Sequence, residues 1–184
     1  GVIGPDKKIN FCYAGDIHLS HEAAVEKCRL FDGAIVDEPG DMVIACGMGY
    51  PKDINLYQTA AKPMNNSVGV LKKDPNSVMI VVSECREGVG SADTDRMLHD
   101  FDNAHDREVY TRENYTIGLN VAYFLTQYAE DFHVILVSSL DADLFKKTKI
   151  HTAKDVDEAI ALAKKLSGKE HPKTYIMPYA ANTC

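Results

Sequence analysis

The sequence has no apolar run long enough to span a membrane, because its longest runs, residues 78–82 and 134–137, have the length of strands. A secretory signal is also missing from its first residues, Gly-Val-Ile-Gly-Pro-Asp-Lys-Lys. Paired cysteines are a third absence: the five cysteines are odd in number and scattered, and three of them lie in apolar, strand-like segments. This pattern is typical of reduced, buried thiols rather than of a disulfide scaffold. We therefore expect a cytoplasmic protein without a membrane partner.

Basic stripes are absent as well. The 20 Lys and Arg residues against 27 Asp and Glu give a formal net charge of −7, whereas binding to nucleic-acid phosphates requires clustered Lys and Arg. No nucleic-acid partner is therefore expected. A composition of 45% hydrophobic and 26% charged residues is typical of a globular chain, and 184 residues can build one α/β domain with a sizeable core.

Strand-like and helix-like segments alternate along the chain. The strongest strands are residues 42–46, 78–84 and 133–140, whose apolar stretches are typical of the interior of a parallel sheet. Weaker strands are expected at residues 2–3, 8–14, 34–36, 150–151 and 174–177. The alternation predicts an α/β fold of the three-layer, Rossmann-like kind, with a mainly parallel sheet and helices on both faces. No repeat or linker interrupts the sequence, so residues 1–184 are expected to form a single domain.

Helices are expected between these strands. Ser20 should cap a helix over residues 21–31, Asp53 a helix through residue 58, and Thr152 an amphipathic helix closed by Gly168. Pro63 should divide the second of these helices, whose later piece reaches about residue 73. Further helices are expected at residues 92–102, 106–110 and 114–129.

The first residues have the pattern of a hairpin that begins abruptly. Residues 2–3 have the character of a strand end, residues 4–6 that of a turn, and residues 8–14 that of the returning strand. Since no initiator Met precedes this hairpin, we expect the chain to be a fragment of a longer protein.

The loop over residues 47–58 is the first candidate for a ligand site, because ligands of open parallel sheets gather at the carboxyl ends of the strands. Its Gly47 and Gly49 allow a backbone to approach a ligand closely, and the start of the next helix offers free N–H groups to an anion. Lys52 at this junction has the charge to pair with a carboxylate or phosphate. An ordinary turn with a solvated Lys52 is the alternative.

The loop over residues 83–90 is the second candidate. Glu84 closes an apolar strand, where a carboxylate requires a hydrogen-bond partner. Backbone amides of a neighbouring loop are the partners we favour, and a role in a site is the alternative. Gly88-Val89-Gly90 lacks the third glycine of a dinucleotide-binding loop, so it is a weak indication of a nucleotide.

No metal ligand or catalytic residue is expected in this chain. His18 and His21 lie near Asp16 and Cys28, but His18 is expected before the helix and Cys28 two turns into it, so a closed tetrahedral shell is not expected. Cys85 has no histidine partner that the sequence makes evident, which argues against a nucleophilic role.

The string Gly49-Tyr50-Pro51-Lys52-Asp53-Ile54-Asn55-Leu56-Tyr57-Gln58 resembles the signature of the carboxy-terminal domain of the lactate racemase family, the nickel-pincer-dependent 2-hydroxyacid racemases and epimerases. Three other segments resemble parts of that domain in the same order. They are Tyr13-Ala14-Gly15-Asp16 followed by His21, the loop from Ser83 to Gly90, and the closing segment from Tyr175 to Thr183. The resemblance runs from about residue 9 to residue 183.

This resemblance implies a two-domain enzyme that inverts the α-carbon of a small 2-hydroxyacid. It implies that a hydride passes from the substrate to a nickel-pincer nucleotide, leaving a 2-keto acid, while histidines act as acid and base on the hydroxyl. The anchoring lysine and those histidines belong to the family's amino-terminal domain, and their motifs are not found in this sequence. This chain would then close the cleft against its own amino-terminal catalytic domain and hold no cofactor alone.

The resemblance also implies the substrate-binding residues Gly49, Tyr50, Lys52, Gln58 and Lys62, with Asp53, Asn55, Glu84 and Cys85 lining the site. One departure concerns the lysine that the family often has three residues after its Tyr-Gln step, because that position is Ala61 here and the lysine is Lys62. One residue along a helix rotates a side chain by about 100°. Either Lys62 reaches round, Lys52 takes over, or the protein acts on a different acid.

Two readings of other classes remain open. One is a stand-alone α/β module that binds a small anion without catalysis. The other is a nucleotide-dependent oxidoreductase, which the glycine-bearing loops permit and the incomplete fingerprint disfavours.

Overall fold

The computed structural model describes residues 1–4, 6–59 and 61–183. Two compact units are present: one contains Gly1–Asp37 and the end of the chain from Asn182, and the other is Glu38–Ala181. The expectation of a single domain over residues 1–184 stays a prediction. Among the described residues, no helix has both the length and the apolar character that crossing a membrane requires.

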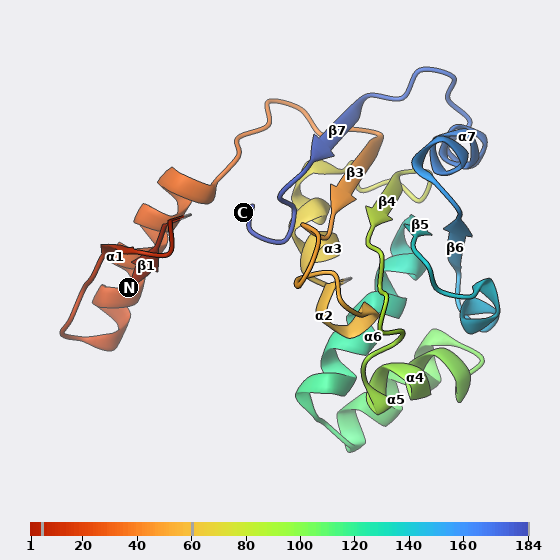
Figure 1. The fold of residues 1–184 in the computed structure, drawn as a ribbon, viewed down its shortest axis with the longest axis horizontal. Helices are drawn as coiled ribbons and strands as arrows, with labels where there is room; N and C mark the ends of the chain where they lie inside the picture. The colour runs from red at the N-terminus through yellow and green to blue at the C-terminus, as the bar shows by residue number, and fades with distance from the viewer. Residues whose placement is uncertain (5, 60, 184) are drawn as a thin grey trace. The chain divides into compact units, whose positions relative to one another are not determined.

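A five-stranded parallel sheet forms the centre of the second unit, in the order β6-β5-β4-β3-β7 (Figure 1). All four pairings are parallel. The three strands with the strongest apolar patterns occupy the interior positions, as predicted. The strands are β3 (Met42–Cys46), β4 (Val78–Val82), β5 (His133–Val137), β6 (Ile150–Ala153) and β7 (Thr174–Met177).

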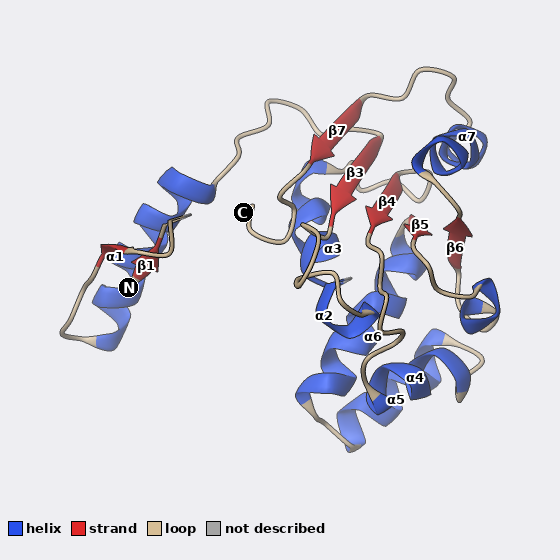
Figure 2. Cartoon of the chain, viewed as in Figure 1, coloured by secondary structure: helices blue, strands red, loops and turns tan. Residues whose placement is uncertain are grey.

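Helices cover both faces of this sheet because alternate side chains of the interior strands are apolar on both sides. One set, including Met42, Ile80 and Ile135, shares a core with Ala159 and Ala163 of α7 (Val156–Ser167). On the other side, α3 (Ala61–Ser67) contacts β3 and β4, and α6 (Ile117–Asp131) contacts β5 (Figure 2). The predicted α/β class with a mainly parallel sheet is confirmed.

Three helices follow β4 and form a corner of the unit, namely α4 (Ala92–His99), α5 (Ala104–Glu113) and α6. Each begins at a polar cap whose side chain accepts the backbone N–H of the residue three positions later. The helix predicted at residues 106–110 is longer on both sides, since Asn103 caps it and accepts from the N–H of Asp106 at 2.9 Å.

The region before α3 differs from the prediction in its cap. Asp53 does not cap α2 (Leu56–Thr59), because its side chain is buried and accepts from the N–H of Glu84 instead. Asn55 takes the capping role, since its Oδ1 accepts from the N–H of Gln58 at 2.9 Å. Pro63 lies in the first turn of α3, where a missing N–H costs little. The helix then tightens into η1 (Val68–Val70) and ends before residue 73.

Three other predicted boundaries are wrong: the ends of β4 and β5 and the start of α7. Strands β4 and β5 end before residues 84 and 140, and the left-handed φ of 53° at Cys85 turns the chain away from the sheet. Thr152 lies in β6, while the carboxylate of Asp155 caps α7 by accepting from the N–H of Glu158 at 2.8 Å. Gly168 closes α7 in the left-handed conformation, with a φ of 67°, as predicted.

The first unit has the expected hairpin, in which β1 (Val2–Ile3) pairs antiparallel with β2 (Ile9–Phe11). Helix α1 (Ile17–Asp32) begins earlier than predicted, because the Asp16 carboxylate accepts from the N–H groups of His18 and Leu19 at 2.9 and 3.1 Å. Ser20 is therefore not the cap, and His18 lies within the helix. The strand expected at residues 34–36 does not form, and Ile35 there is 98% exposed.

The described cysteines are all free thiols, but their burial varies. Cys85 is buried, Cys28 and Cys46 are half-buried, and Cys12 is exposed, which contradicts the expectation of burial there. Cys184 lies outside the described residues.

Candidate functional site

The two predicted ligand loops lie side by side at the carboxyl edge of the sheet. Four backbone hydrogen bonds of 2.8 to 3.1 Å join them. The N–H groups of Cys85 and Glu87 donate to residues 53 and 54, and those of Leu56 and Tyr57 donate to residues 88 and 89. The prediction that these loops are neighbours is confirmed, and their ladder fixes the position of the residues between them.

The first loop presents polar groups at the surface. Met48 and Gly49 have left-handed φ values of 77° and 72°, and the N–H groups of Lys52 and Asp53 both donate to the carbonyl of Gly49. This tight turn leaves Tyr50 67% exposed and Lys52 exposed as well. A phenol and an ammonium group are thus held at the edge by a backbone that is itself hydrogen-bonded.

The side chain of Glu84 binds Arg86, not the backbone amides of the neighbouring loop, so the partner favoured from the sequence is wrong. Its carboxylate accepts from Nη2 and Nε of Arg86 at 2.7 and 3.2 Å, and this ion pair raises the pKa of Arg86. The guanidinium also lies over the ring of Tyr50, 5.3 Å from its centroid. Glu84 and Arg86 therefore neutralise each other, while Arg86 links the second loop to Tyr50.

Beneath the loops lies a buried polar cluster of Asp53, Thr59, Ser83 and Cys85. In the described part of the chain, Asp53 Oδ1 and Thr59 Oγ1 have no hydrogen-bond partner. The thiol of Cys85 lies 3.3 Å from the hydroxyl of Ser83. Burial, reinforced by the charges of Asp53 and Glu84, raises the pKa of Cys85 to about 11. The thiol is therefore protonated at neutral pH, and the absence of a nucleophilic role stays a prediction.

Gly47 is required where this cluster meets β3, and replacing it by alanine tests the packing. A Cβ there would lie 2.3 Å from Thr59 Oγ1 and 3.3 Å from both the Cβ of Asp53 and the hydroxyl of Ser83. We expect Gly47→Ala to lower the free energy of unfolding by about 1–3 kcal/mol in urea titrations. Gly69→Ala is the control, because nothing lies within 4 Å of its Cβ. Equal stabilities for the two variants would show that the cluster is not closely packed.

The remaining candidates, Gln58 and Lys62, lie on the two short helices that follow the first loop. Gln58 is exposed on α2, and Lys62 on α3 lines a groove of about 310 Å³ against α6. The contribution of α6 to this groove was not predicted from the sequence. Its only signal is a pair of aromatic residues four positions apart, Phe124 and Tyr128, in an otherwise amphipathic helix.

Metal ligands are not gathered anywhere in the described residues, since no group of three or more His, Cys, Asp or Glu side chains there is placed to hold an ion. His18 and His21 lie on the exposed surface of α1. These described residues therefore offer no such group to the nickel-bearing cofactor that the family resemblance implies, and the expectation that the chain alone holds no cofactor stays a prediction.

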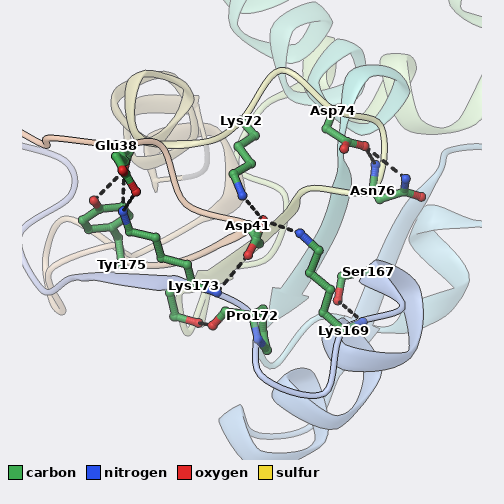
Figure 3. Close-up of polar contacts among 11 residues, drawn as sticks. Glu38, Asp41, Lys72, Asp74, Asn76, Ser167, Lys169, Pro172, Lys173 and Tyr175 are labelled. Atoms are coloured by element: carbon green, nitrogen blue, oxygen red, sulfur yellow. Dashed lines mark hydrogen bonds and ion pairs between the residues drawn. The ribbon is translucent and has the colours of Figure 1, made fainter.

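A second charged cluster lies at the opposite, amino-terminal edge of the sheet (Figure 3). The buried carboxylate of Asp41, just before β3, accepts from Lys72 Nζ and Lys169 Nζ, both at 2.6 Å, and from the N–H of Lys173 at 2.9 Å. The bonds from Lys169 and Lys72 hold the pKa of Asp41 well below its ordinary value of 3.8. Because its oxygens are occupied by three segments of the chain, Asp41 joins those segments and is not a ligand site.

A parallel α/β unit with two hydrogen-bonded loops at its carboxyl edge is a domain of the kind that binds small ligands at that edge. Residues 35–181 match the model of a family described as the lactate racemase C-terminal domain. The chain belongs to this family, as its resemblance to the family predicted. No curated protein matches the chain.

Two solved structures are similar to the chain. The lactate racemase apoprotein from Thermoanaerobacterium thermosaccharolyticum is 24% identical, with a TM-score of 0.83 over 99% of this chain and 44% of that one. A protein from Thermotoga maritima, a structural genomics target, is 16% identical, with a TM-score of 0.55 over 89% of this chain and 41% of that one. At these identities the similarity establishes the fold. The chain spans less than half the length of either structure.

Proposed function

We propose that this chain is the carboxy-terminal part of a racemase or epimerase that inverts the α-carbon of a 2-hydroxyacid. In this role it closes the cleft and contributes substrate contacts. The observation that carries the proposal is the pair of joined loops at the carboxyl edge, which display the family string with Tyr50 and Lys52 exposed.

The contribution of this chain to the reaction would be binding and orientation. A lysine beside the substrate carboxylate supplies a charge-assisted hydrogen bond, and either Lys52 or Lys62 is suited to this by its exposure. Gln58, exposed on α2, offers an amide to the same acid. These contacts fix the α-carbon for the group that accepts its hydride.

The hydride acceptor would lie in the partner domain, since no amino-acid side chain accepts a hydride. The family resemblance implies a nickel-pincer nucleotide held by the amino-terminal domain, which is also the expected partner of this chain. The length of the two similar structures, of which this chain covers 44% and 41%, supports the presence of such a second part. A cytoplasmic location stays a prediction.

The test compares the chain alone with the chain joined to an amino-terminal domain that carries the cofactor. We expect racemisation of lactate or malate, measured by chiral chromatography, only in the joined protein. In that protein, Lys52→Ala or Lys62→Ala should lower kcat/KM about ten- to a hundredfold, whichever lysine contacts the carboxylate. Lys165→Ala on α7 is the control, since that exposed lysine lies on the other side of the sheet.

Several outcomes would contradict this division of roles. One is inversion by the chain alone, and another is unchanged kinetics in both lysine variants. Binding of the acid without any inversion in the joined protein would instead favour a module that captures an anion.

A further inference from the structure

The groove between α3 and α6 has the electrostatics of an anion site. Among the described residues that line it, Lys62 carries the only charge, and none carries a carboxylate. No described residue forms an ion pair or hydrogen bond with the Lys62 ammonium. The other polar lining groups are neutral, namely the amides of Asn65, Asn66 and Asn120 and the hydroxyl of Tyr128, and such groups can hydrogen-bond to a carboxylate or hydroxyl. A single positive charge suits a ligand with one negative charge.

The opposite wall of the groove is aromatic. Phe124 and Tyr128 stack along α6 with their ring centroids 6.1 Å apart and an interplanar angle of 28°. Phe124 is 42% exposed, although α6 buries its other face in the core. The hydroxyl of Tyr128 donates to Asn65 Oδ1 at 3.0 Å, so α6 and α3 are linked across the groove. An exposed phenyl ring beside Val121 in a preformed groove offers apolar contact to a ligand.

The volume of the groove is larger than a three-carbon acid would fill. Its 310 Å³ corresponds to about ten water-sized groups, more than the non-hydrogen atoms of lactate. Ala61, which also lines the groove, contributes only a methyl group to its wall. A short side chain at residue 61 leaves the ammonium of Lys62 beside an open, apolar space.

We propose that this groove binds carboxylates that bear an aryl or branched apolar side chain, with Lys62 on the carboxylate and the side chain against Phe124 and Val121. This proposal rests on the proposed function, in which the groove would select 2-hydroxyacids larger than lactate.

The position of the groove follows from the two helices that form it. Lys62 and Ala61 lie in the first turn of α3, and Asn120 lies in the first turn of α6. Helix α3 leads into β4 and α6 leads into β5, so each helix runs from the carboxyl edge of the sheet back toward the amino-terminal edge, where the next strand begins. The first turns of both helices therefore lie toward the carboxyl edge. Lys62 and Asn120 therefore lie at the end of the groove that is toward the edge where the two loops meet.

The test measures binding of 3-phenyllactate and of lactate to the 184-residue chain itself, by isothermal titration or by shifts of backbone amide resonances. We expect 3-phenyllactate to bind about tenfold or more tightly than lactate, with its shifts confined to α3 and α6. Lys62→Gln should weaken both acids about tenfold. Phe124→Ala should weaken 3-phenyllactate alone, and Lys165→Gln should change neither.

Equal affinities for the two acids, or 3-phenyllactate binding that Lys62→Gln leaves unchanged, would overturn the inference. Val121→Phe narrows the groove without removing a polar group, so undiminished 3-phenyllactate binding by this variant would also overturn it. The racemase assay is separate from these measurements. Inversion of lactate by the joined protein, with no binding of 3-phenyllactate to the chain, would reject the inference and keep the proposed function. Binding of 3-phenyllactate in the groove, without inversion of any acid by the joined protein, would keep the groove as a binding site and reject the proposed function.

Discussion

The Asp41→Asn variant is expected to lose about 3 kcal/mol of unfolding free energy at neutral pH, measured by urea denaturation. Asp41 is 8% exposed, and its carboxylate accepts from Lys72, Lys169 and the backbone N–H of Lys173, so it joins β3, β7 and the segments after η1 and α7 (Figure 3). An amide in its place brings no negative charge and directs N–H groups toward donors. The side chains of Lys72 and Lys169 are nearly half exposed, so their ammonium groups can return to water, which limits the loss of stability.

The stability difference between wild type and this variant should also depend on pH. Because the pKa of Asp41 is lowered in the folded state, its stabilisation is fully present above the ordinary value of 3.8. It is lost as the pH falls below 3.8 toward the folded-state pKa. Urea midpoints of the two proteins should therefore converge in that acidic range.

Glu38→Gln provides the matched control for Asp41. Glu38 belongs to the same cluster and pairs with Lys173 Nζ at 3.2 Å, but its side chain is 80% exposed. An exposed pair of this kind contributes about 0.5 kcal/mol or less. If the two variants lose the same stability, or if the Asp41→Asn difference persists unchanged in acid, burial of the Asp41 carboxylate does not have the role assigned to it.

The parts of the fold that sequence could predict are those in which a whole segment carries the pattern. Strands β3, β4 and β5 read as apolar runs because both faces of a central parallel strand are buried. Helix starts were less predictable, because several polar residues compete to cap one helix. Asp16 capped instead of Ser20, and Asp155 instead of Thr152. Asp16 and Asp155 each lie directly before the first helical residue, which places the carboxylate near the free N–H groups of the first turn.

The candidate site also has parts that the sequence predicts and parts that it does not. The joined loops were predictable because both follow central strands, whose carboxyl ends meet at one edge. The ion pair of Glu84 and Arg86 was not, since two residues in one loop form it and the sequence indicated a partner from another loop. The groove beside Lys62 depends on α6, more than fifty residues downstream, and only tertiary packing places Asn120 and Phe124 there.

Arg107 shows how a charged side chain can serve as a core residue. It is 1% exposed and its guanidinium donates to the carbonyl oxygens of Met97, Phe101 and Lys147. Met97 lies in the last turn of α4, Phe101 in the loop between α4 and α5, and Lys147 shortly before β6. The Arg107 side chain therefore joins the corner formed by the helices to the sheet. Burial lowers the pKa of Arg107, which identifies desolvation as the cost that these hydrogen bonds offset.

Arg107→Met is therefore expected to lower the free energy of unfolding by about 3–5 kcal/mol, because it keeps much of the apolar stem but leaves three carbonyl oxygens without their donor. Arg112→Met on the same helix is the matched control. Arg112 is 76% exposed and pairs only with Glu108 among the described residues, one turn earlier, so its loss should change stability by about 0.5 kcal/mol or less. Urea titration gives both values, and native-state hydrogen exchange locates the effect, since protection should fall in α4 and α5 before it falls in β4. Similar stabilities for the two variants, or a loss of protection spread evenly over the sheet, would rule out Arg107 as the residue that joins this corner.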